Sequence, residues 1–319
     1  MLAFLKDRRG EWVSGQILAE RTAMTRAAVW KRIGVLREAG YGIEAVTRKG
    51  YRLQEIPDRL LPSEISDGLK TRIMGRGEIR HLEEAASTNQ TAKEMAISGA
   101  PEGSLVVAEA QSWGRGRLDR CWFSPAGQGI YASLIIRPPL PPSEASRLVL
   151  LTAVAVAEAL RETTGLAATI KWPNDILVGG RKMAGILTEL AMEMDAVNYM
   201  VIGLGLNVNI DEAAFPAEFR SAATSVLLET GVPFSRVLLL RRFLEAFENR
   251  YLLFRESGFA PILARWKTLT DMTGRQVTVQ TVGGSYRGKV AGFDGDGFLI
   301  LRDEKGGKLR LVSGDVQMV

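Results

Sequence analysis

A loop rich in glycine and arginine is the stretch of the sequence best equipped for chemistry. It reads QSWGRGRLDRCW over residues 111–122 and places the guanidinium groups of Arg115, Arg117 and Arg120 close together. Glycine lets a backbone approach a ligand closely, and clustered guanidinium groups favour an anion. A tryptophan near each end offers a flat apolar surface to a ring. The loop is therefore a candidate anion site, although a solvated basic turn would have the same sequence.

Three further motifs follow this loop in the chain. They read KWPNDI at residues 171–176, RKMAGILTE at 181–189 and GLGLNVN at 203–209, and a polar triplet lies upstream at 87–89. In this order they resemble the biotin protein ligases, over most of the chain. Any one of the motifs is weak, whereas the ordered set is specific.

The resemblance implies a biotin–[biotin carboxyl-carrier protein] ligase. Such an enzyme joins the biotin carboxylate to the α-phosphate of ATP and passes the acyl group of biotinyl-5'-AMP to a lysine of biotin carboxyl carrier protein, a part of acetyl-CoA carboxylase. ATP and biotin are then the substrates, with Mg²⁺ as the metal. Carboxylate and triphosphate repel each other, by roughly 4 kcal/mol per pair of unit charges at 4 Å, so the site must supply cations.

Lys182, Arg115 and Arg117 are the candidate cations of the catalytic step. Guanidinium grips a phosphate at two points, whereas an ammonium group acts as a point charge. By resemblance, residues 115–117 cover the biotin carboxylate and the adenylate phosphate, and Lys182 bridges the two. The alternative for Lys182 is a surface lysine beside Arg181.

The ureido head of biotin needs hydrogen-bond donors and acceptors that replace water. The resemblance assigns biotin binding to polar, basic and glycine residues: Ser87, Thr88, Asn89, Gln111, Arg115, Gly116, Arg117, Lys182 and Gly185. The triplet 87–89 would equally serve as the cap of a helix that follows it.

ATP and the adenylate are assigned by the same resemblance to Trp122, Asn174, Asp175 and Asn207. Pro173 ends a strand, so the two residues after it fall on a tight turn. Asp175 is the candidate metal ligand through Mg-ATP, because Mg²⁺ usually takes one or two carboxylates together with substrate oxygens. A plain turn and a core tryptophan are the alternatives.

The loop departs from the usual GRGRRGR pattern of the family at Leu118 and Asp119. The loss of a glycine removes a residue suited to positive φ, although Asp tolerates that region better than most residues. Asp119 also lowers the local positive charge. We expect the departure to bear on retention of the adenylate and on any contact of this loop between subunits. The loop 111–122 and the segment 211–223 are the natural lids over a water-sensitive anhydride.

Cysteine and histidine content argues against several other chemistries. One cysteine, Cys121, rules out an internal disulfide framework and fits a reducing compartment. One histidine, His81, argues against a Ser/His/Asp triad and is expected at the surface or at a helix end. The sequence has no run of about 18 apolar residues, and MLAFLKDRRG is charged too early for a signal peptide. A cytoplasmic protein without a membrane partner is expected.

The N-terminal segment carries the whole charge excess. Residues 1–60 hold 12 Lys and Arg against 7 Asp and Glu. Their net charge of +5 equals the formal net charge of the whole chain. Ser14 and Thr25 can cap two helices at the short spacing of a helix-turn-helix, and a hairpin with a basic tip follows, as in a winged helix. The candidate DNA contacts are Arg26, Ala27, Lys31, Arg48 and Lys49.

The segment TRAAVWKRIGVLREAG, followed by RKGYRL, resembles the DNA-binding domain of the bifunctional members, the biotin operon repressors. The resemblance implies operator DNA of biotin biosynthesis genes as a partner, bound by a homodimer. The alternative is a helical interaction domain with a solvated basic face.

The elements that position these residues predict an α+β protein of three domains. A winged helix-turn-helix is expected at 1–62, and a mixed α+β ligase domain of the biotin/lipoate ligase type, with helices mainly on one face of its sheet, at 63–270. Short alternating strands and glycine-rich turns predict a small Src-homology-3-like β-barrel at 271–319. A ligase and repressor is the favoured function; a ligase without DNA specificity, a DNA-binding biotin sensor with weak ligase activity and a lipoate-type ligase stay open.

Overall fold

A computed structural model describes residues 1–193, 196–303 and 305–318, apart from the side chains of Asp119 and Glu193. The chain forms two compact units, Met1–Asp58 and Arg59–Val319. The predicted α+β class is confirmed: a helix-turn-helix unit precedes a large mixed sheet with helices and a small antiparallel sheet. The domain boundaries at 62/63 and 270/271 stay predictions.

The N-terminal unit consists of three helices and a hairpin: α1 (Leu2–Asp7), α2 (Gly15–Thr22), α3 (Arg26–Glu38), β1 (Gly42–Val46) and β2 (Gly50–Glu55). Both predicted caps are present. The hydroxyl of Ser14 accepts from the backbone N–H of Ile17, and that of Thr25 from Ala28, each at 3.2 Å. One stripe of α3 is apolar and buried: Val29, Ile33 and Leu36.

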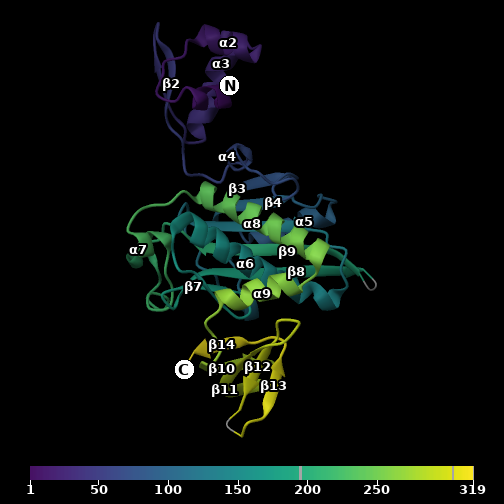
Figure 1. Ribbon diagram of the computed structural model, residues 1–319. Helices are drawn as coiled ribbons and strands as arrows, with labels where there is room; N and C mark the ends of the chain where they lie inside the picture. Colours follow the sequence, from purple (N-terminus) through teal and green to yellow (C-terminus); the bar gives the residue numbers. More distant parts are fainter. Residues whose placement is uncertain (194–195, 304, 319) are drawn as a thin grey trace. The chain divides into compact units, whose positions relative to one another are not determined.

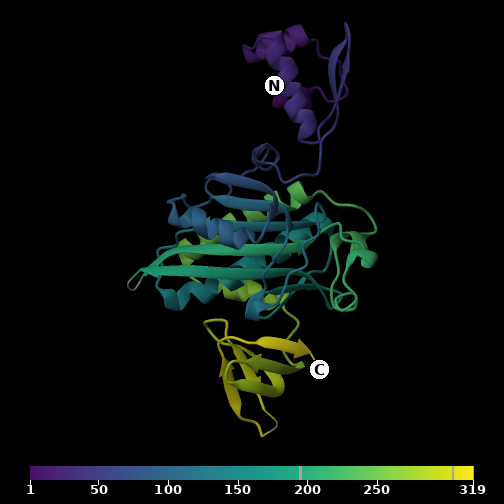
Figure 2. The ribbon, with the colours of Figure 1, turned by 180° about the vertical axis from the view of Figure 1, so that it is seen from behind.

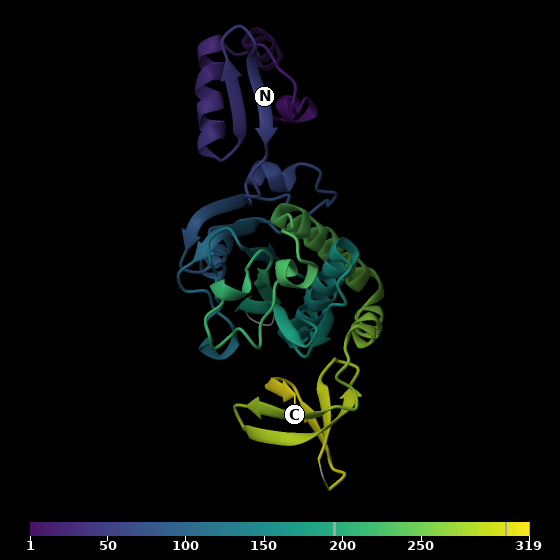
Figure 3. The same cartoon turned by 90° about the vertical axis from the view of Figure 1, so that its left-hand side faces the viewer.

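The predicted wing is the β1–β2 hairpin (Figure 3), in which Val46 pairs with Gly50. At its tip, Arg48 has a φ of +68° and Gly50 a φ of +100°. A Cβ at Gly50 would lie 2.2 Å from the carbonyl oxygen of Val13, so glycine lets the hairpin close against that backbone. The ammonium of Lys49 stands 5.7 Å from the centroid of the Trp12 ring. The cationic tip is confirmed.

A seven-stranded sheet forms the centre of the second unit, in the order β3-β4-β5-β9-β8-β7-β6. Its strands are β3 (Ile79–Ala85), β4 (Leu105–Gln111), β5 (Gly129–Ile136), β6 (Thr169–Lys171), β7 (Asp175–Val178), β8 (Arg181–Glu193) and β9 (Ala196–Asn207). The β3–β4 pair is parallel and the other pairs are antiparallel. Asn174 and Asp175 were both expected on a tight turn after Pro173. Asp175 instead begins β7, because its backbone pairs with Gly185 of β8.

Helices cover the two faces of this sheet unequally. The long helices α6 (Ala145–Thr164), α8 (Arg236–Ser257) and α9 (Ala260–Leu269) lie together over one face (Figure 1), and α5 (Thr88–Ile97) lies on the other (Figure 2). The short elements are α4 (Pro62–Ser66), α7 (Val226–Thr230) and the 3₁₀ turns η1 (Arg117–Asp119), η2 (Pro142–Glu144) and η3 (Glu212–Ala214). The expected one-sided arrangement is confirmed. None of the helices within the described ranges is both long and apolar enough to cross a membrane.

The C-terminal part is a five-stranded antiparallel sheet, in the order β13-β12-β11-β10-β14. Its strands are β10 (Gln276–Thr281), β11 (Gly284–Phe293), β12 (Leu299–Arg302), β13 (Lys308–Leu311) and β14 (Asp315–Met318). The first four were predicted and β14 was not. The sheet shares a core with the central part of this unit. The rings of Phe293 and Trp266 meet edge-on, with 4.5 Å between their centroids. The indole N–H of Trp172 donates to the carbonyl of Gly297 at 3.0 Å.

The expectation for His81 is wrong. It lies in β3 with its side chain 12% exposed, and its Nε2 is 3.0 Å from Oε1 of Glu109. The same carboxylate accepts from the backbone N–H of Leu60 at 2.9 Å and from Arg236 Nη1 at 2.7 Å. A buried polar cluster therefore joins the start of the second unit, the strands β3 and β4 and the helix α8. A single histidine among polar residues of the sequence does not indicate partners on other strands and helices.

Candidate active site

A large cavity in the second unit brings together motifs that lie far apart in the chain. Its volume is about 660 Å³, and the loop 111–122, the segment 211–223 and the strands β8, β9 and β14 contribute to its walls. The lining includes every residue assigned above to biotin, to ATP or to the catalytic step: Ser87, Thr88, Asn89, Gln111, Arg115, Gly116, Arg117, Trp122, Asn174, Asp175, Lys182, Gly185 and Asn207.

Bare glycines form the floor of the cavity. Gly185 in β8 pairs with Gly205 in β9, and Gly203 lies two residues earlier on β9, so all three face the same side of the sheet. A Cβ on Gly205 would lie 2.5 Å from Nε1 of Trp122, and one on Gly203 would lie 2.2 Å from Oδ1 of Asn89. The glycines therefore let these two side chains lie directly on the sheet. The buried Nε1–H of Trp122 has no hydrogen-bond partner among the described residues.

Replacing Gly205 by alanine is expected to lift Trp122 from the sheet, because the new methyl group would occupy the place of the indole. We expect the affinity for biotin with ATP to fall by about tenfold, the scale of an overpacking penalty of about 1–3 kcal/mol. Titration calorimetry and tryptophan fluorescence would measure both effects. Gly295→Ala is the matched control, because a Cβ there meets nothing within 4 Å. If Gly205→Ala left the emission spectrum and the affinity unchanged, the glycine would not be needed to let Trp122 lie on the sheet.

The start of α5 forms a polar end of the cavity. Ser87 is the N-cap residue of α5, yet its hydroxyl makes no capping hydrogen bond. Helix capping therefore does not explain the serine at this position. The backbone N–H and the hydroxyl of Thr88 both donate to Oε1 of Gln111, at 2.9 and 3.2 Å. The amide of Asn89 donates to Glu189 at 2.8 Å. These bonds fix Thr88 to Gln111 and Asn89 to β8, and the Ser133 hydroxyl links the two residues, at 2.8 Å from Oγ1 of Thr88 and 2.7 Å from Oδ1 of Asn89.

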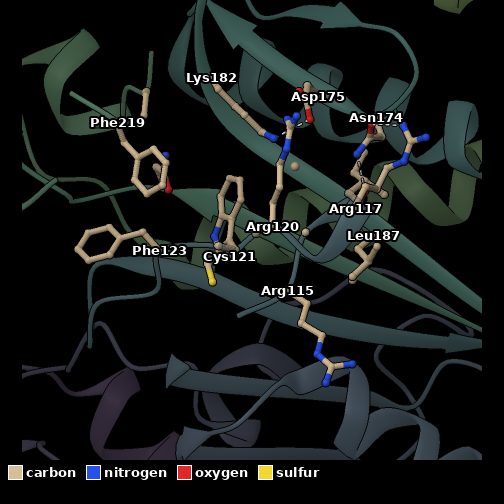
Figure 4. A pocket seen from close by; sticks show the side chains of 18 of the residues that line it. Arg115, Arg117, Arg120, Cys121, Phe123, Asn174, Asp175, Lys182, Leu187 and Phe219 are labelled. Carbon is tan, nitrogen blue, oxygen red and sulfur yellow. Dashed lines mark hydrogen bonds and ion pairs between the residues drawn. The ribbon is translucent and has the colours of Figure 1, made fainter. Parts of the chain in front are cut away.

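A carboxylate between two lysines forms a charged end of the cavity, and Figure 4 shows this carboxylate, Asp175, near Lys182. Asp175 opens β7 opposite Gly185. Its Oδ1 lies 2.7 Å from Nζ of Lys182, and its Oδ2 lies 3.5 Å from Nζ of Lys171. The Lys182 ammonium also stands 5.3 Å from the centroid of the Trp122 ring, within the range of a cation–π contact. Asp175 thus orients the side chain of Lys182, which is 36% exposed and lines the cavity.

Arg117 is held by oxygens from two different parts of the unit. Its Nη1 donates to Oδ1 of Asn174 at 3.0 Å and to the carbonyl of Gly314 at 3.3 Å, and Figure 4 shows its side chain beside Asn174. Burial lowers the pKa of Arg117, and the charges of Asp175 and Asp315 oppose that shift. A guanidinium group stays charged under such conditions. The result is a partly desolvated cation held chiefly by neutral acceptors, which suits an incoming anion.

The two asparagines assigned to ATP are anchored to the backbone. Asn174 donates through Nδ2 to the carbonyl of Ile186 at 2.8 Å, and Asn207 donates to that of Thr224 at 2.9 Å. The Thr224 N–H in turn donates to the carbonyl of Lys182 at 2.9 Å. Asn174 therefore positions Arg117, and Asn207 fixes the end of the segment 211–223 next to Lys182. These positioning contacts were not foreseen from the sequence, because they depend on backbone carbonyls of distant strands.

The loop 111–122 forms a small hairpin around the turn η1. The N–H of Gly116 donates to the carbonyl of Arg120 at 2.7 Å, and that of Trp122 to the carbonyl of Gly114 at 2.8 Å. The positive φ of this loop, +56°, falls on Leu118. The left-handed position is thus one residue earlier than the sequence comparison with GRGRRGR suggested. The predicted effect of the Asp119 charge lies outside the described residues.

The other two arginines of the loop point in different directions. Figure 4 shows the Arg115 side chain directed away from Lys182 and Asp175, although the residue lines the cavity. Arg120 forms an ion pair with Asp315 of β14, with 2.6 Å between Nη2 and Oδ2. The loop is therefore tied to the C-terminal sheet through Arg117 and Arg120.

The segment 211–223 was expected as a lid, but its aromatic residues were not singled out, and a wall formed by β14 was not expected. Phe215 and Phe219 project from the segment 211–223, where Phe215 packs on Phe123 with 6.1 Å between ring centroids. Phe219 is 37% exposed, whereas Phe215 is buried. Two aromatic residues in a segment rich in Ala and Pro were the available signal. Residues 315–318 of β14 form the second wall. No local pattern reveals that wall, because it exists only where the C-terminal sheet folds back on the loop.

Comparison with known families assigns the three parts of the chain. A model of the biotin/lipoate A/B protein ligase family matches residues 82–207, an HTH domain matches residues 1–52, and a biotin protein ligase C-terminal domain matches residues 273–319. The order of the three matches is that of the predicted domains.

Curated relatives match along the whole chain. The bifunctional ligase/repressor BirA of Bacillus subtilis is 42% identical over 318 residues, which cover 100% of this chain and 97% of that protein. BirA of Escherichia coli is 33% identical, over 96% of this chain and 95% of its own. Among solved structures, the biotin protein ligase of Aquifex aeolicus in complex with biotin and ATP matches with a TM-score of 0.65 and 28% identity, over 76% of this chain and 98% of that one.

Proposed function

The chain belongs to the biotin protein ligase family, among the members that also carry a DNA-binding domain, and from this premise we infer that it is an ATP-dependent biotin protein ligase and a biotin-responsive repressor. The ligase activates biotin as biotinyl-5'-AMP and transfers it to a lysine of a biotin carboxyl carrier protein. The observation that carries the ligase activity is the cavity of about 660 Å³, where bare glycines separate a polar end at α5 from the cations Lys182 and Arg117.

We place the ureido ring of biotin at the polar end, against Ser87 and the rigid Thr88–Gln111 group. Its apolar tail then passes over Gly203, and its carboxylate points toward Lys182. The adenine ring lies against Trp122, whose unpartnered Nε1–H is free to donate to a ligand acceptor. This placement matches each chemical part of the adenylate with a surface of the same character.

In the first step, a carboxylate oxygen of biotin attacks the α-phosphorus of ATP. The bond from that phosphorus to the bridging oxygen breaks, and pyrophosphate leaves with the bonding electrons. Arg117 and Lys182 reduce the repulsion between the two anions and stabilise the charge that builds on the phosphate. Asp175 orients the Lys182 ammonium through the 2.7 Å contact between Oδ1 and Nζ. The cation therefore needs little reorganisation during the reaction.

In the second step, the neutral amine of the acceptor lysine attacks the acyl carbon of biotinyl-5'-AMP. The acyl–oxygen bond breaks, AMP leaves with the bonding electrons, and the proton of the new amide nitrogen passes to solvent. The same two cations stabilise the departing phosphate. Phe215 and Phe219 shield the anhydride from water before the acceptor arrives.

We propose that magnesium enters as part of Mg-ATP. No group of three His, Cys, Asp or Glu suited to a metal occurs in the described part of the chain. Two carboxylates line the cavity in the described structure: the oxygens of Asp175 already face Lys182 and Lys171, and Asp315 is paired with Arg120. That donor set does not make a resident metal site. Triphosphate oxygens would supply the remaining ligands of the ion.

We propose further that the N-terminal unit binds operator DNA of biotin biosynthesis genes as part of a homodimer, with Arg26, Ala27, Lys31, Arg48 and Lys49 at the DNA. The basic excess of residues 1–60 and the cationic wing support this proposal. Because DNA, ATP and the carrier protein must all be accessible to the chain, we place it in the cytoplasm.

The ligase is tested by incubating the full chain with biotin, ATP, Mg²⁺ and a biotin carboxyl carrier domain. We expect the intact mass of the carrier to rise by one biotinyl group, with biotinyl-5'-AMP as an intermediate. Adenylate without transfer would indicate a biotin sensor instead, and modification with lipoate but not biotin would indicate a lipoate-type ligase. If neither the adenylate nor the biotinylated carrier forms, the ligase function is refuted.

The repressor is tested separately, by salt-titrated binding to promoter DNA of biotin biosynthesis genes and to unrelated DNA. We expect tighter binding to the promoter when biotin and ATP are present. Equal weak affinity for both DNA molecules at every salt concentration would leave a ligase without DNA specificity.

A further inference from the structure

One stripe of α3 faces outward with an unusual set of side chains. It consists of Ala27, Trp30, Lys31 and Gly34, which are spaced i, i+3, i+4 and i+7 and therefore share one side of the helix. Trp30 is 71% exposed, although tryptophan is usually largely buried. The buried stripe of α3 faces a different direction. The exposed indole is thus not part of the core of its own unit.

Gly34 gives independent support for a partner at this stripe. Glycine inside a helix costs about 1 kcal/mol relative to alanine, and Gly34 lies well inside the 13 residues of α3. A Cβ there would meet nothing within 4 Å in the described structure, and the residue has no positive φ. Neither packing nor backbone conformation within the chain therefore requires glycine. A surface from another molecule that approaches this side of the helix would require it.

The charge around the stripe identifies the chemistry of that molecule. Lys31 lies within the stripe, Arg26 opens the helix, and Arg48 stands at the tip of the wing in the same unit. All three are exposed. These cations suit phosphate groups, whereas the stripe itself has only one charge and is otherwise small or aromatic. A surface of this kind, a narrow ridge with a single charge and basic flanks, suits the major groove of double-stranded DNA.

We propose that Trp30 is a sequence-reading residue of the DNA-binding unit, and that its indole contacts the 5-methyl group of a thymine in the major groove. The recognition helix of the homeodomain, a helix-turn-helix variant, uses the same i, i+3, i+4, i+7 spacing to reach base edges. Apolar contact with the thymine methyl is a general means of base readout. Ala27 and Gly34 keep the ridge low on both sides of the indole, so the helix can approach the bases. The inference rests on the proposed repressor function and names the base that this function reads.

The experiment begins with the full chain in the presence of biotin and ATP and with randomised duplex DNA as the probe. Duplexes that the wild type selects are then remade with uracil in place of each thymine in turn, which removes one methyl group per position. We expect wild-type affinity to fall roughly threefold to tenfold at one or more thymines, about the value of one buried methyl group. Trp30→Ala should bind the selected duplex roughly 5- to 100-fold more weakly and should not respond to uracil.

Two controls separate reading from folding and from phosphate binding. Val35→Ala removes an exposed apolar side chain from the same helix, 47% exposed and outside the stripe, and should bind like the wild type. In Trp30→Ala, the affinity for unselected DNA and its salt dependence should be unchanged, because the phosphate contacts are retained. Trp30→Phe should recover part of the response to uracil.

The outcomes distinguish this inference from the function on which it rests. If the wild type enriches no sequence, the repressor function itself fails, and the inference fails with it. If the wild type selects a site and Trp30→Ala retains the same affinity and uracil response, the inference alone is overturned. It is also overturned if Trp30→Ala alters self-association in analytical ultracentrifugation but keeps the uracil response, because the indole would then contact a second copy of the chain.

Discussion

Replacing Lys182 by alanine is expected to lower the rate of biotinyl-5'-AMP formation by roughly 10²- to 10³-fold, the effect of removing one preorganised group that stabilises transition-state charge. Lys182 is aimed by Asp175 at 2.7 Å and stands over Trp122 at 5.3 Å. Its ammonium is therefore preorganised where carboxylate and phosphate must meet. Pyrophosphate release under single-turnover conditions would measure the first step, and transfer from prepared biotinyl-5'-AMP would measure the second.

The neighbouring residue offers a matched control for this substitution. Arg181 precedes Lys182 in β8, points to the other side of the strand and forms an ion pair with Glu229 at 2.8 Å. Arg181→Ala should leave adenylate formation close to that of the wild type. Lys182→Arg tests the geometry, because guanidinium keeps the charge but not the compact shape of ammonium. Adenylate formation in Lys182→Ala within threefold of the wild type would contradict the catalytic assignment.

Replacing Arg236 by methionine is expected to destabilise the second unit by roughly 3–5 kcal/mol, the cost of leaving one partner of a buried ion pair without the other. Arg236 is 2% exposed and lies 2.7 Å from Glu109, which is itself 6% exposed. Urea unfolding followed by circular dichroism would measure the change. Arg242→Met on the same helix removes an arginine that is 44% exposed and should cost at most about 1 kcal/mol.

The acid dependence of this loss gives a second readout. Burial raises the pKa of Glu109, but the hydrogen bond from His81, the charge and hydrogen bond of Arg236 and the N–H of Leu60 outweigh burial and lower the pKa to about 2. Because the folded pKa lies below the ordinary value of 4.5, the ionised carboxylate stabilises the fold above about pH 4.5, and this contribution is lost between about pH 4.5 and pH 2. The deficit of Arg236→Met should therefore shrink as the pH falls through this range. A deficit that is the same at pH 7 and pH 3 would argue against the ion pair as its source.

Local patterns in the sequence were sufficient for most of the elements, although not for β7 and β14, and the ordered motifs pointed to the candidate residues. Ser14 and Thr25 precede apolar residues at helical spacing, so their hydroxyls could be expected to cap α2 and α3. Turns that contain glycine separate the strands β10–β13, and GRGR, KWPND and GLGLN mark the walls of one cavity. These features depend on neighbouring residues and on residue type, which the sequence states directly.

The contacts that give those residues their roles required the tertiary structure. The 2.7 Å pair of Lys182 and Asp175 depends on the register of β7 with β8. The Trp122 indole lies on Gly205 because the loop 111–122 folds over β9, and Arg117 reaches Gly314 because the C-terminal sheet packs beside the loop.

His81 was misplaced because its partners, Glu109 and Arg236, lie on β4 and α8. Spacing along the chain determines helices, strands and caps, since their hydrogen bonds are local. Distances between side chains on different elements depend on how whole layers pack, and no local pattern in the sequence reports them.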